Sequence, residues 1–234
     1  MTDLHTHLLP GMDNGSESME QTLDMLRLCA AQGIRTVVAT PHFNLQKETI
    51  AAFAARRAAA IATVTQEVGW QVLPTILPGA EVFFDLELCH CEELSTLCLA
   101  GSNAMLLEFP MSPWNRQLLG ALYQFICTSG VTVVIAHAER YFRTQSRGNL
   151  KNLLAMGALL QADADFFISP RTRKKALRLL SQNRIHFIAS DCHSSQLRPP
   201  NLGNALNVIS GWLGVEAVNR LASRTRTLIH LELE

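Results

Sequence analysis

Histidines and acidic residues follow the short apolar runs of this sequence with a recurring spacing. His5 and His7 lie two residues apart at the end of the first run. Asp191 and His193 have the same spacing after a run near the other end of the chain. Side chains two residues apart on a β-strand point to the same face, so each pair can reach one metal ion. The other ligand-type residues that follow apolar runs are His42, Glu81, Glu108 and His137.

Together these residues form a mixed set of imidazole and carboxylate ligands. Such a set suits two or three closely spaced divalent ions, and manganese, iron and zinc all fit it. It does not offer the purely carboxylate coordination that magnesium would prefer. Ions bridged in this way polarise a phosphoryl oxygen and generate hydroxide near neutral pH. The sequence therefore predicts a centre for the metal-dependent hydrolysis of a phosphate ester.

Each of these residues also has a simpler interpretation. A lone histidine at the end of a strand is more often a hydrogen-bonded structural residue than a metal ligand. Here, however, five of the eight histidines and three acidic residues follow six different strand candidates. His90, His186 and His230 do not follow this pattern, and we expect them to be structural or surface residues.

Two arginines accompany these ligand-type residues. Arg140 follows His137 in His-Ala-Glu-Arg-Tyr, and Arg198 stands just before Pro199-Pro200. An isolated arginine is usually a solvated surface residue. Beside a metal cluster, a planar guanidinium group matches the non-bridging oxygens of a phosphate, and we expect these two arginines to bind it.

The six cysteines suggest a different chemistry, which we consider less fitting. Cys89-His90-Cys91 with Cys98 could form a zinc site, but the spacing fits no common structural-zinc pattern and no second ligand pair follows. Without a secretory leader, the cysteines do not indicate a disulfide framework. We expect no phosphocysteine intermediate, and we expect Cys192, between two ligand-type residues on a strand, to point away from the metals.

The elements that must position these residues alternate along the whole chain. The strand candidates are residues 2–5, 34–40, 71–77, 104–109, 131–136, 158–162 and 186–190. The helical patterns are 17–32, 46–68, 115–128, 148–156 and 171–182, with two more after Pro200. This alternation predicts a parallel sheet with helical crossovers. About seven such units, with both ends of the chain supplying ligands, favour a closed barrel, in which the carboxyl ends of the strands meet at one face. No glycine-rich phosphate loop follows the first strand, which argues against a Rossmann fold.

Composition sets the outer limits of this interpretation. The chain has 234 residues, 48% of them hydrophobic, and a formal net charge of zero. One α/β domain spanning 1–234 is expected at this length, because barrels of this size commonly do not divide. A general nucleic-acid binder would be strongly basic. No apolar run of membrane-spanning length and no secretory leader is present, so we expect a cytoplasmic protein without membrane insertion. We assign no role to residues 231–234, whose Leu-Glu repeat could be non-native.

Several longer motifs contain the ligand-type residues. They are Asp3-Leu4-His5-Thr6-His7 with Pro10-Gly11-Met12-Asp13-Asn14-Gly15, the stretch from Gly33 to Pro41-His42, Gly79-Ala80-Glu81-Val82, Leu106-Leu107-Glu108-Phe109, Ile135-Ala136-His137-Ala138-Glu139-Arg140-Tyr141, and Ile188-Ala189-Ser190-Asp191-Cys192-His193 with Arg198-Pro199-Pro200. With these motifs the sequence resembles the PHP (polymerase and histidinol phosphatase) superfamily. It is most similar to the bacterial PHP-type protein tyrosine phosphatases of capsule and exopolysaccharide loci.

This resemblance implies a distorted (β/α)7 barrel that holds up to three metal ions, usually manganese. It implies that Arg140 and Arg198 bind phosphate. The ligands that it implies are His5, His7, His42, Glu81, Glu108, His137, Asp191 and His193, with Glu81 bridging. Members of this family dephosphorylate the tyrosine-rich tail of an autophosphorylating kinase, which makes such a phosphotyrosine protein the expected partner. One position differs: where the family has Asp-Asp-Gly, this chain has Asp13-Asn14-Gly15. Asn14 can coordinate the third metal through its carbonyl oxygen but adds no charge.

Two other functions share these residues. A PHP phosphoesterase acting on histidinol phosphate or a nucleotide would use the same metal ligands. A barrel that binds a partner without catalysis is the alternative from a different class, and Asn14 is the feature that favours it. The sequence sets no oligomeric state.

Overall fold

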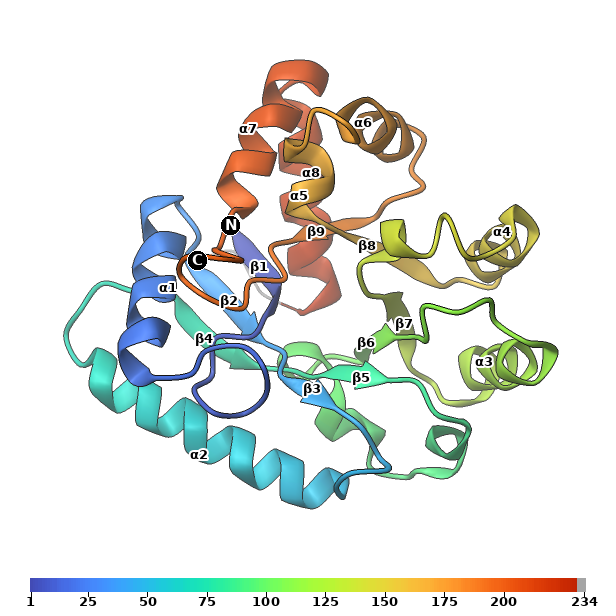
Figure 1. Ribbon diagram of the computed structural model, residues 1–234, viewed down its shortest axis with the longest axis horizontal. Coiled ribbons are helices and arrows are strands. Elements are labelled where there is room, and N and C mark those ends of the chain that lie inside the picture. The colour runs from blue at the N-terminus through green and yellow to red at the C-terminus, as the bar shows by residue number, and fades with distance from the viewer. Residues whose placement is uncertain (231–234) are drawn as a thin grey trace.

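The strands of the computed structural model, which describes residues 1–230, surround a central axis and all run in parallel (Figure 1). Residues 231–234, to which the sequence assigns no role, lie outside the described part. The strands are β1 (Thr2–Thr6), β2 (Thr36–Ala39), β3 (His42–Phe43), β4 (Thr75–Pro78), β5 (Glu81–Phe83), β6 (Ala104–Glu108), β7 (Thr132–Ile135), β8 (Leu159–Asp163) and β9 (Phe187–Ala189). One sheet has the order β1-β2-β4, and the other has the order β3-β5-β6-β7-β8-β9.

The two sheets share two interrupted strands. Pro41, which has no N–H group, stands between β2 and β3, and Gly79 stands between β4 and β5. A Cβ atom on Gly79 would lie 2.7 Å from Cγ1 of Val38, so only glycine allows the backbone after β4 to pass this close to β2. After the interruption the pairing resumes with His42 opposite Glu81. In each interrupted strand, the first residue after the interruption is therefore a ligand-type residue, His42 in β3 and Glu81 in β5.

Backbone hydrogen bonds close the ring between the first and last strands. Thr6 forms a parallel bridge with Cys192, which lies just beyond β9. The backbone N–H of His7 donates to the carbonyl oxygen of Cys192 at 2.8 Å, and that of Asp191 donates to His5 at 3.0 Å. Counting each interrupted strand once, the ring has seven strand positions. The predicted distorted barrel of seven units is confirmed.

Helices cover the outside of this ring (Figure 1). They are α1 (Met19–Ala31), α2 (Ile50–Val68), α3 (Arg116–Thr128), α4 (Arg147–Ala155), α5 (Ala164–Ile168), α6 (Arg173–Ser181), α7 (Leu202–Leu213) and α8 (Val215–Leu228). Short 3-10 helices span Leu86–His90, Leu94–Leu97, Leu99–Gly101 and Ala138–Arg140. The hydroxyls of Ser18 and Thr49 accept from the first-turn N–H groups of α1 and α2. These caps explain why the helices begin later than the predicted residues 17 and 46.

The sequence prediction was wrong at three further places. Of the predicted strand 71–77 only 75–77 pair in β4, because Val72 lies almost fully exposed in the turn after α2. The strands β3 and β5 were not predicted, since two or three residues are too few to show a period. The five-residue helix α5 was also missed, because it follows β8 directly without an intervening breaker.

The interior of the barrel is filled with apolar side chains below the ligand-type residues. This inner cluster consists of Leu4, Val38, Leu99, Ala104, Leu106, Val134, Ala136, Phe187, Ala189 and Ile229. Two larger clusters fill the space between the strands and the outer helices. Because the inner cluster closes the barrel below, polar groups at the carboxyl ends of the strands open to one side only. No helix among residues 1–230 is both long and apolar enough to cross a membrane.

Candidate metal centre

A β-bulge in β1 aims two histidines into the barrel. Opposite β2, the pairing advances three residues from Asp3 to Thr6 but only two from Val37 to Ala39. The additional residue shifts the alternation of side chains, so Leu4 and His5 both face inward although they are neighbours. His5 and His7 thereby reach the open end of the barrel, where both are fully buried.

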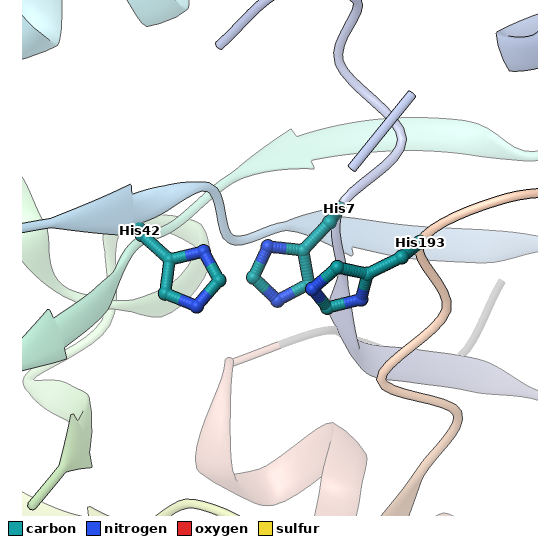
Figure 2. A group of neighbouring side chains, drawn as sticks. All are labelled: His7, His42 and His193. Carbon is teal, nitrogen blue, oxygen red and sulfur yellow. The ribbon is translucent and has the colours of Figure 1, made fainter. Parts of the chain in front are cut away.

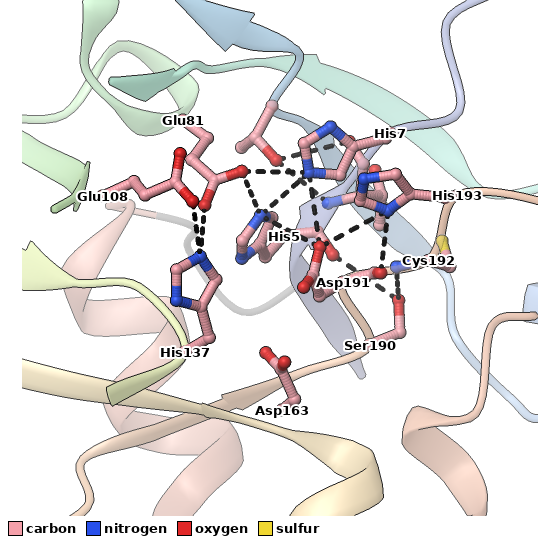
Figure 3. Close-up of polar contacts among 12 residues, drawn as sticks. His5, His7, Glu81, Glu108, His137, Asp163, Ser190, Asp191, Cys192 and His193 are labelled. Atoms are coloured by element: carbon pink, nitrogen blue, oxygen red, sulfur yellow. Dashed lines mark hydrogen bonds and ion pairs between the residues drawn. The ribbon is translucent and has the colours of Figure 1, made fainter. Parts of the chain in front are cut away.

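Residues 1–230 contain three groups of histidines and acidic residues whose ligand atoms lie within 4.8 Å of one another, and the first group is His5, His7, Glu81 and Asp191. The Nε2 atoms of His5 and His7 are 3.0 Å apart, and they lie 3.1 and 3.2 Å from the same oxygen of Glu81. Figure 3 shows these contacts. Each imidazole has its other nitrogen, Nδ1, engaged elsewhere: His5 with Gln161 at 3.2 Å and His7 with Asp13 at 2.7 Å.

These partners decide where the imidazole protons are. The side-chain oxygen of Gln161 also accepts from the backbone N–H of His137, and a carboxylate accepts only. In the neutral rings both Nδ1 atoms therefore donate, which leaves the two Nε2 lone pairs facing each other. Two lone pairs at 3.0 Å repel unless a cation lies between them and the carboxylates. The donor set thus fits a metal ion held through Nε2 of both histidines.

His7, His42 and His193 form the second group, drawn in Figure 2. The ring centroid of His7 lies 4.4 Å from that of His42 and 4.0 Å from that of His193. Burial, with His7 and Arg198 nearby, lowers the pKa of His193 to about 3. The neutral ring keeps a lone pair for coordination at ordinary pH.

Glu81 joins the first group to the third, which consists of His42, Glu81 and Glu108. Its second oxygen lies 2.8 Å from Nε2 of His137, which is 3.5 Å from Glu108. Burial opposes ionisation of Glu81, but the imidazoles around it, that of His5 foremost, hold the pKa of this carboxyl well below its usual range. A charged carboxylate in the middle of the cluster is suited to bridging two ions.

Unsatisfied polar atoms and backbone strain mark the same place. Oδ1 of Asp191 and Nδ1 of His137 are buried without a hydrogen-bond partner among the described residues. A metal ion would satisfy the Asp191 oxygen. Both residues also have positive φ angles, 52° for Asp191 and 31° for His137. Such strain is typical of functional sites, because ordinary packing does not maintain it.

The two predicted phosphate-binding arginines meet at Asp191. Nη2 of Arg140 and Nη2 of Arg198 lie 2.5 and 2.6 Å from the same oxygen of this carboxylate. Arg140 also binds Asp163 at 2.8 Å. About a third or more of each arginine side chain is exposed, so both guanidinium groups lie at the rim of the cluster and can be reached from solvent.

Asn14 lies at the exposed rim of the site, beside these groups. It is exposed and lines two pockets, one next to His193 and one next to His42 and Glu108. Its role as a ligand of the third metal therefore stays a prediction. The preceding residue, Asp13, was not predicted as a site residue, yet its Oδ2 accepts from Nδ1 of both His7 and His42.

Two other residues of the site were missed. Gln161 and Asp163 face into the barrel from β8, where Gln161 orients His5 and Asp163 binds Arg140. Asp163 ends its strand in the manner of Glu108, so the signal used for the other strands would have found it at the end of 158–162. Gln161 gives no comparable signal, because an amide inside a strand is common.

Residues outside the pattern have structural environments. Nδ1 of His186 accepts from the backbone N–H of Leu160, while His90 and His230 are exposed, as predicted. The thiols of Cys89, Cys91 and Cys98 each donate to a different backbone carbonyl.

The Cys-x5-Arg spacing of thiol phosphatases occurs twice, at Cys29–Arg35 and Cys192–Arg198, so spacing alone does not exclude that chemistry. Burial does. Cys29 and Cys192 lie in one apolar cluster, and burial raises the pKa of both thiols far above the ordinary value. The sulfur of Cys192 points away from the histidines, as expected (Figure 3).

A closed parallel barrel with three ligand groups at the carboxyl ends of its strands agrees with the PHP-type barrel that the sequence resemblance implies. The chain belongs to the family described as capsular polysaccharide synthesis, CpsB/CapC, which matches residues 1–229. It is 30% identical to the tyrosine-protein phosphatase YwqE of Bacillus subtilis over 98% of this chain and 91% of the relative. It is 27% identical to the tyrosine-protein phosphatase CpsB of Streptococcus agalactiae, over 94% of both chains.

A solved structure agrees with these relatives. The chain is similar to one from the crystal structures of YwqE from Bacillus subtilis and CpsB from Streptococcus pneumoniae, described as metal-dependent tyrosine phosphatases. The TM-score is 0.86 at 27% identity, and the match covers 100% of this chain and 96% of the other.

Proposed function

We propose that this protein is a metal-dependent phosphatase that hydrolyses phosphotyrosine in a protein substrate. The observation that carries the proposal is the arrangement of three ligand groups around the buried Glu81, with two arginines at their rim. Membership of the CpsB/CapC family and the similarity to tyrosine phosphatases support the choice of substrate.

The ligand residues would hold two or three divalent ions, with manganese as the proposed metal and iron or zinc as alternatives. The proposed ligands are His5, His7, His42, Glu81, Glu108, His137, Asp191 and His193, with Asn14 as a further ligand of the third ion. When bound, these ions supply Lewis acidity to the phosphoryl group and lower the pKa of water. The protein fixes the ligands beforehand: Gln161 and Asp13 hold the rings of His5 and His7 with Nε2 toward the metals.

Arg140 and Arg198 would bind the equatorial oxygens of the phosphate. Both share one oxygen of Asp191, so each has guanidinium N–H groups left over. Coordination of Asp191 to a metal would weaken its hold on the arginines and release them for the substrate. Charge-assisted bonds of this kind stabilise charge that develops on the phosphoryl oxygens.

The aryl ester fits this site better than an alkyl ester. Phenols have a pKa of about 10, far below that of an alcohol, so a phenolate leaves with little help from an acid. The family's part in capsular polysaccharide synthesis favours the tail of a tyrosine kinase as the substrate. We further propose that the reaction takes place in the cytoplasm, where such a tail would be phosphorylated.

The deciding measurement is kcat/KM of manganese-loaded protein with four substrates: a phosphotyrosine peptide, a phosphoserine peptide, histidinol phosphate and a nucleotide. We expect the phosphotyrosine peptide to lead. Para-nitrophenyl phosphate does not discriminate, because its activated leaving group suits almost any phosphatase. A lead of tenfold or more for histidinol phosphate or the nucleotide would replace the proposal with the small-molecule alternative. If fully metal-loaded protein hydrolyses none of the four substrates, the alternative of a barrel that binds a partner without catalysis would replace the proposal.

A further inference from the structure

Another pocket adjoins the metal centre on the side of Arg140. It has a volume of about 500 Å³, which is within the range of ligand sites. Its walls come from segments that follow β6, β7 and β8, so it opens at the same end of the barrel as the metal centre. Arg140 lines this pocket and also binds Asp191, which makes it the wall between the two sites.

The charges around this pocket are nearly all positive. Arg143, Arg171 and Lys175 line it together with Arg140. The one acidic residue of the lining, Glu139, turns its carboxylate toward the backbone N–H of Asp163. The chain as a whole has no net charge, so this concentration of cations is local.

Two of these cations have no partner among residues 1–230. The side chains of Arg143 and Arg171 are exposed, and neither forms an ion pair or a hydrogen bond with residues 1–230. By contrast, Arg56 pairs with Glu48 and Arg27 pairs with Asp24. Two unpaired guanidinium groups facing one cavity are suited to an anion with several oxygens.

The remaining wall of the pocket is apolar. Phe166 is nearly buried and Met111 is about half exposed, and both line the cavity beside the arginines. The pocket therefore suits a side chain that has an apolar part and an anionic end.

We propose that this pocket binds a second anionic side chain of the substrate peptide while the first phosphotyrosine occupies the metal centre. The proposal rests on the function proposed above and adds to it a preference for peptides with a carboxylate or a second phosphate near the reacting residue. The two sites share Arg140, so one short peptide segment can reach both. The ligand class is an acidic or phosphorylated side chain, and the apolar wall favours the ring of a second phosphotyrosine.

The test is steady-state kinetics of manganese-loaded protein with a set of peptides. Each peptide has one phosphotyrosine and, at a scanned neighbouring position, tyrosine, glutamate or a second phosphotyrosine. We expect the anionic peptides to have a KM about tenfold below that of the tyrosine peptide, as one or two charge-assisted bonds would give, with kcat nearly unchanged. Equal gains from glutamate and phosphotyrosine indicate a general anion site, and a gain from phosphotyrosine alone indicates that a single carboxylate cannot replace the phosphorylated ring.

The matched variants are the double substitution Arg143→Ala/Arg171→Ala and the control Arg220→Ala, which removes an exposed arginine on α8. The double variant should lose the preference for anionic peptides and retain its activity on the tyrosine peptide. The control should keep both. A wild type without preference, or a double variant that retains the preference, would overturn the proposal.

A binding measurement separates this proposal from the phosphatase assignment. The same peptides, fluorescently labelled, are titrated with metal-loaded protein and followed by anisotropy. If none is hydrolysed, tighter binding of the anionic peptides by wild type than by the double variant still supports the pocket. Equal binding by both proteins overturns it whether or not the peptides are hydrolysed.

Discussion

Asp13 accepts hydrogen bonds from His7 and His42 through the ring nitrogens that face away from the proposed metals. It also accepts from the backbone N–H of His42, so one oxygen of this carboxylate makes three contacts. Burial opposes ionisation of Asp13, but hydrogen bonds from His42 and His7 hold the pKa of this carboxyl far below its ordinary value. It is therefore ionised at any ordinary pH and fixes both rings with Nε2 toward the cluster.

Asp13→Asn should weaken manganese binding by about 10- to 100-fold, as is usual when a partner that orients metal ligands is lost. The amide has a single acceptor oxygen, and its NH2 group would face a ring N–H. Metal titration measures the effect. Asp24→Asn is the control, because Asp24 is a half-exposed carboxylate of α1 whose one ion pair within residues 1–230 is with Arg27. Unchanged manganese affinity in Asp13→Asn would show that the histidines need no such support.

Arg140→Ala and Arg198→Ala should each lower kcat/KM by about one to three orders of magnitude, through lost charge-assisted bonds to phosphate. Metal content should stay near that of the wild type, because neither arginine is a ligand. Elemental analysis and phosphotyrosine kinetics measure the two quantities separately. Loss of metal in either variant would assign that arginine to holding Asp191 in place instead.

At the scale of the elements, the interrupted strands determine where His42 and Glu81 lie. Gly79→Ala would place a Cβ atom 2.7 Å from Val38 and 3.1 Å from Thr40. Overpacking of this kind costs about 1–3 kcal/mol, so we expect a lower free energy of unfolding in denaturant. Since Glu81 follows two residues later, metal affinity should fall as well.

Gly211→Ala provides the matched comparison. Gly211 lies in the exposed part of α7, and no atom lies within 4 Å of the position of an added Cβ. This variant should be as stable as the wild type or slightly more stable, because alanine favours helix. Equal stability of both variants would mean that the strands at Gly79 can separate without cost.

The junction between β8 and β9 gives a prediction about pH. His186 accepts from the backbone N–H of Leu160, and burial, with Arg224 nearby, lowers its pKa from 6.5 to about 4. Between these pH values the unfolded chain takes up a proton at this residue and the folded protein does not. The free energy of unfolding should therefore fall as the pH decreases from 6.5 towards 4.

His186→Asn keeps an acceptor near the Leu160 N–H but does not titrate. Melting curves at several pH values should show a shallower decrease for this variant than for the wild type below pH 6.5. Parallel curves would show that His186 contributes nothing to the acid sensitivity.

Comparison with the sequence shows which elements carry a local signal. Apolar periodicity and breaker residues can be read within one segment of the sequence. They were enough to predict the barrel, the order of its elements, and the two helices α7 and α8. The lengths of β3 and β5 do not, because His42–Phe43 and Glu81–Phe83 become strands only through their neighbours. The bulge in β1 is likewise set by pairing with β2, so the sequence showed that His5 and His7 share a face but not that Leu4 shares it. Asp13 contributes through contacts across the fold, which spacing does not reveal.

At the scale of the whole molecule, the proposed metals connect strands from both ends of the chain. Removing them should lower the melting temperature, because a ligand that binds only the folded state stabilises it. At a concentration one hundred times the dissociation constant, this effect is about 2.7 kcal/mol, or about 5–10 °C for a protein of this size. Differential scanning calorimetry before and after chelation, and after return of manganese, measures it.

His5→Ala/His7→Ala is the control for this experiment, since it should show neither the decrease nor the recovery. Elemental analysis of the wild type should find at least two metal equivalents. A chelated wild type that melts at the same temperature and still hydrolyses phosphotyrosine would contradict the assignment of the metal centre.

The bridge between Thr6 and Cys192 has a consequence for the synthesis of the protein. The ribosome makes β1 well before its partner beside β9, because nearly all the other strands and helices lie between them in the chain. Until then, the inner edge of β1 is unpaired and His5 and His7 lack Asp191 and His193. A nascent chain with an open strand edge is exposed to wrong pairing, and the delay is longest for contacts between distant residues. Metal capture should accordingly be a late event, completed only when Asp191 and His193 have left the ribosome.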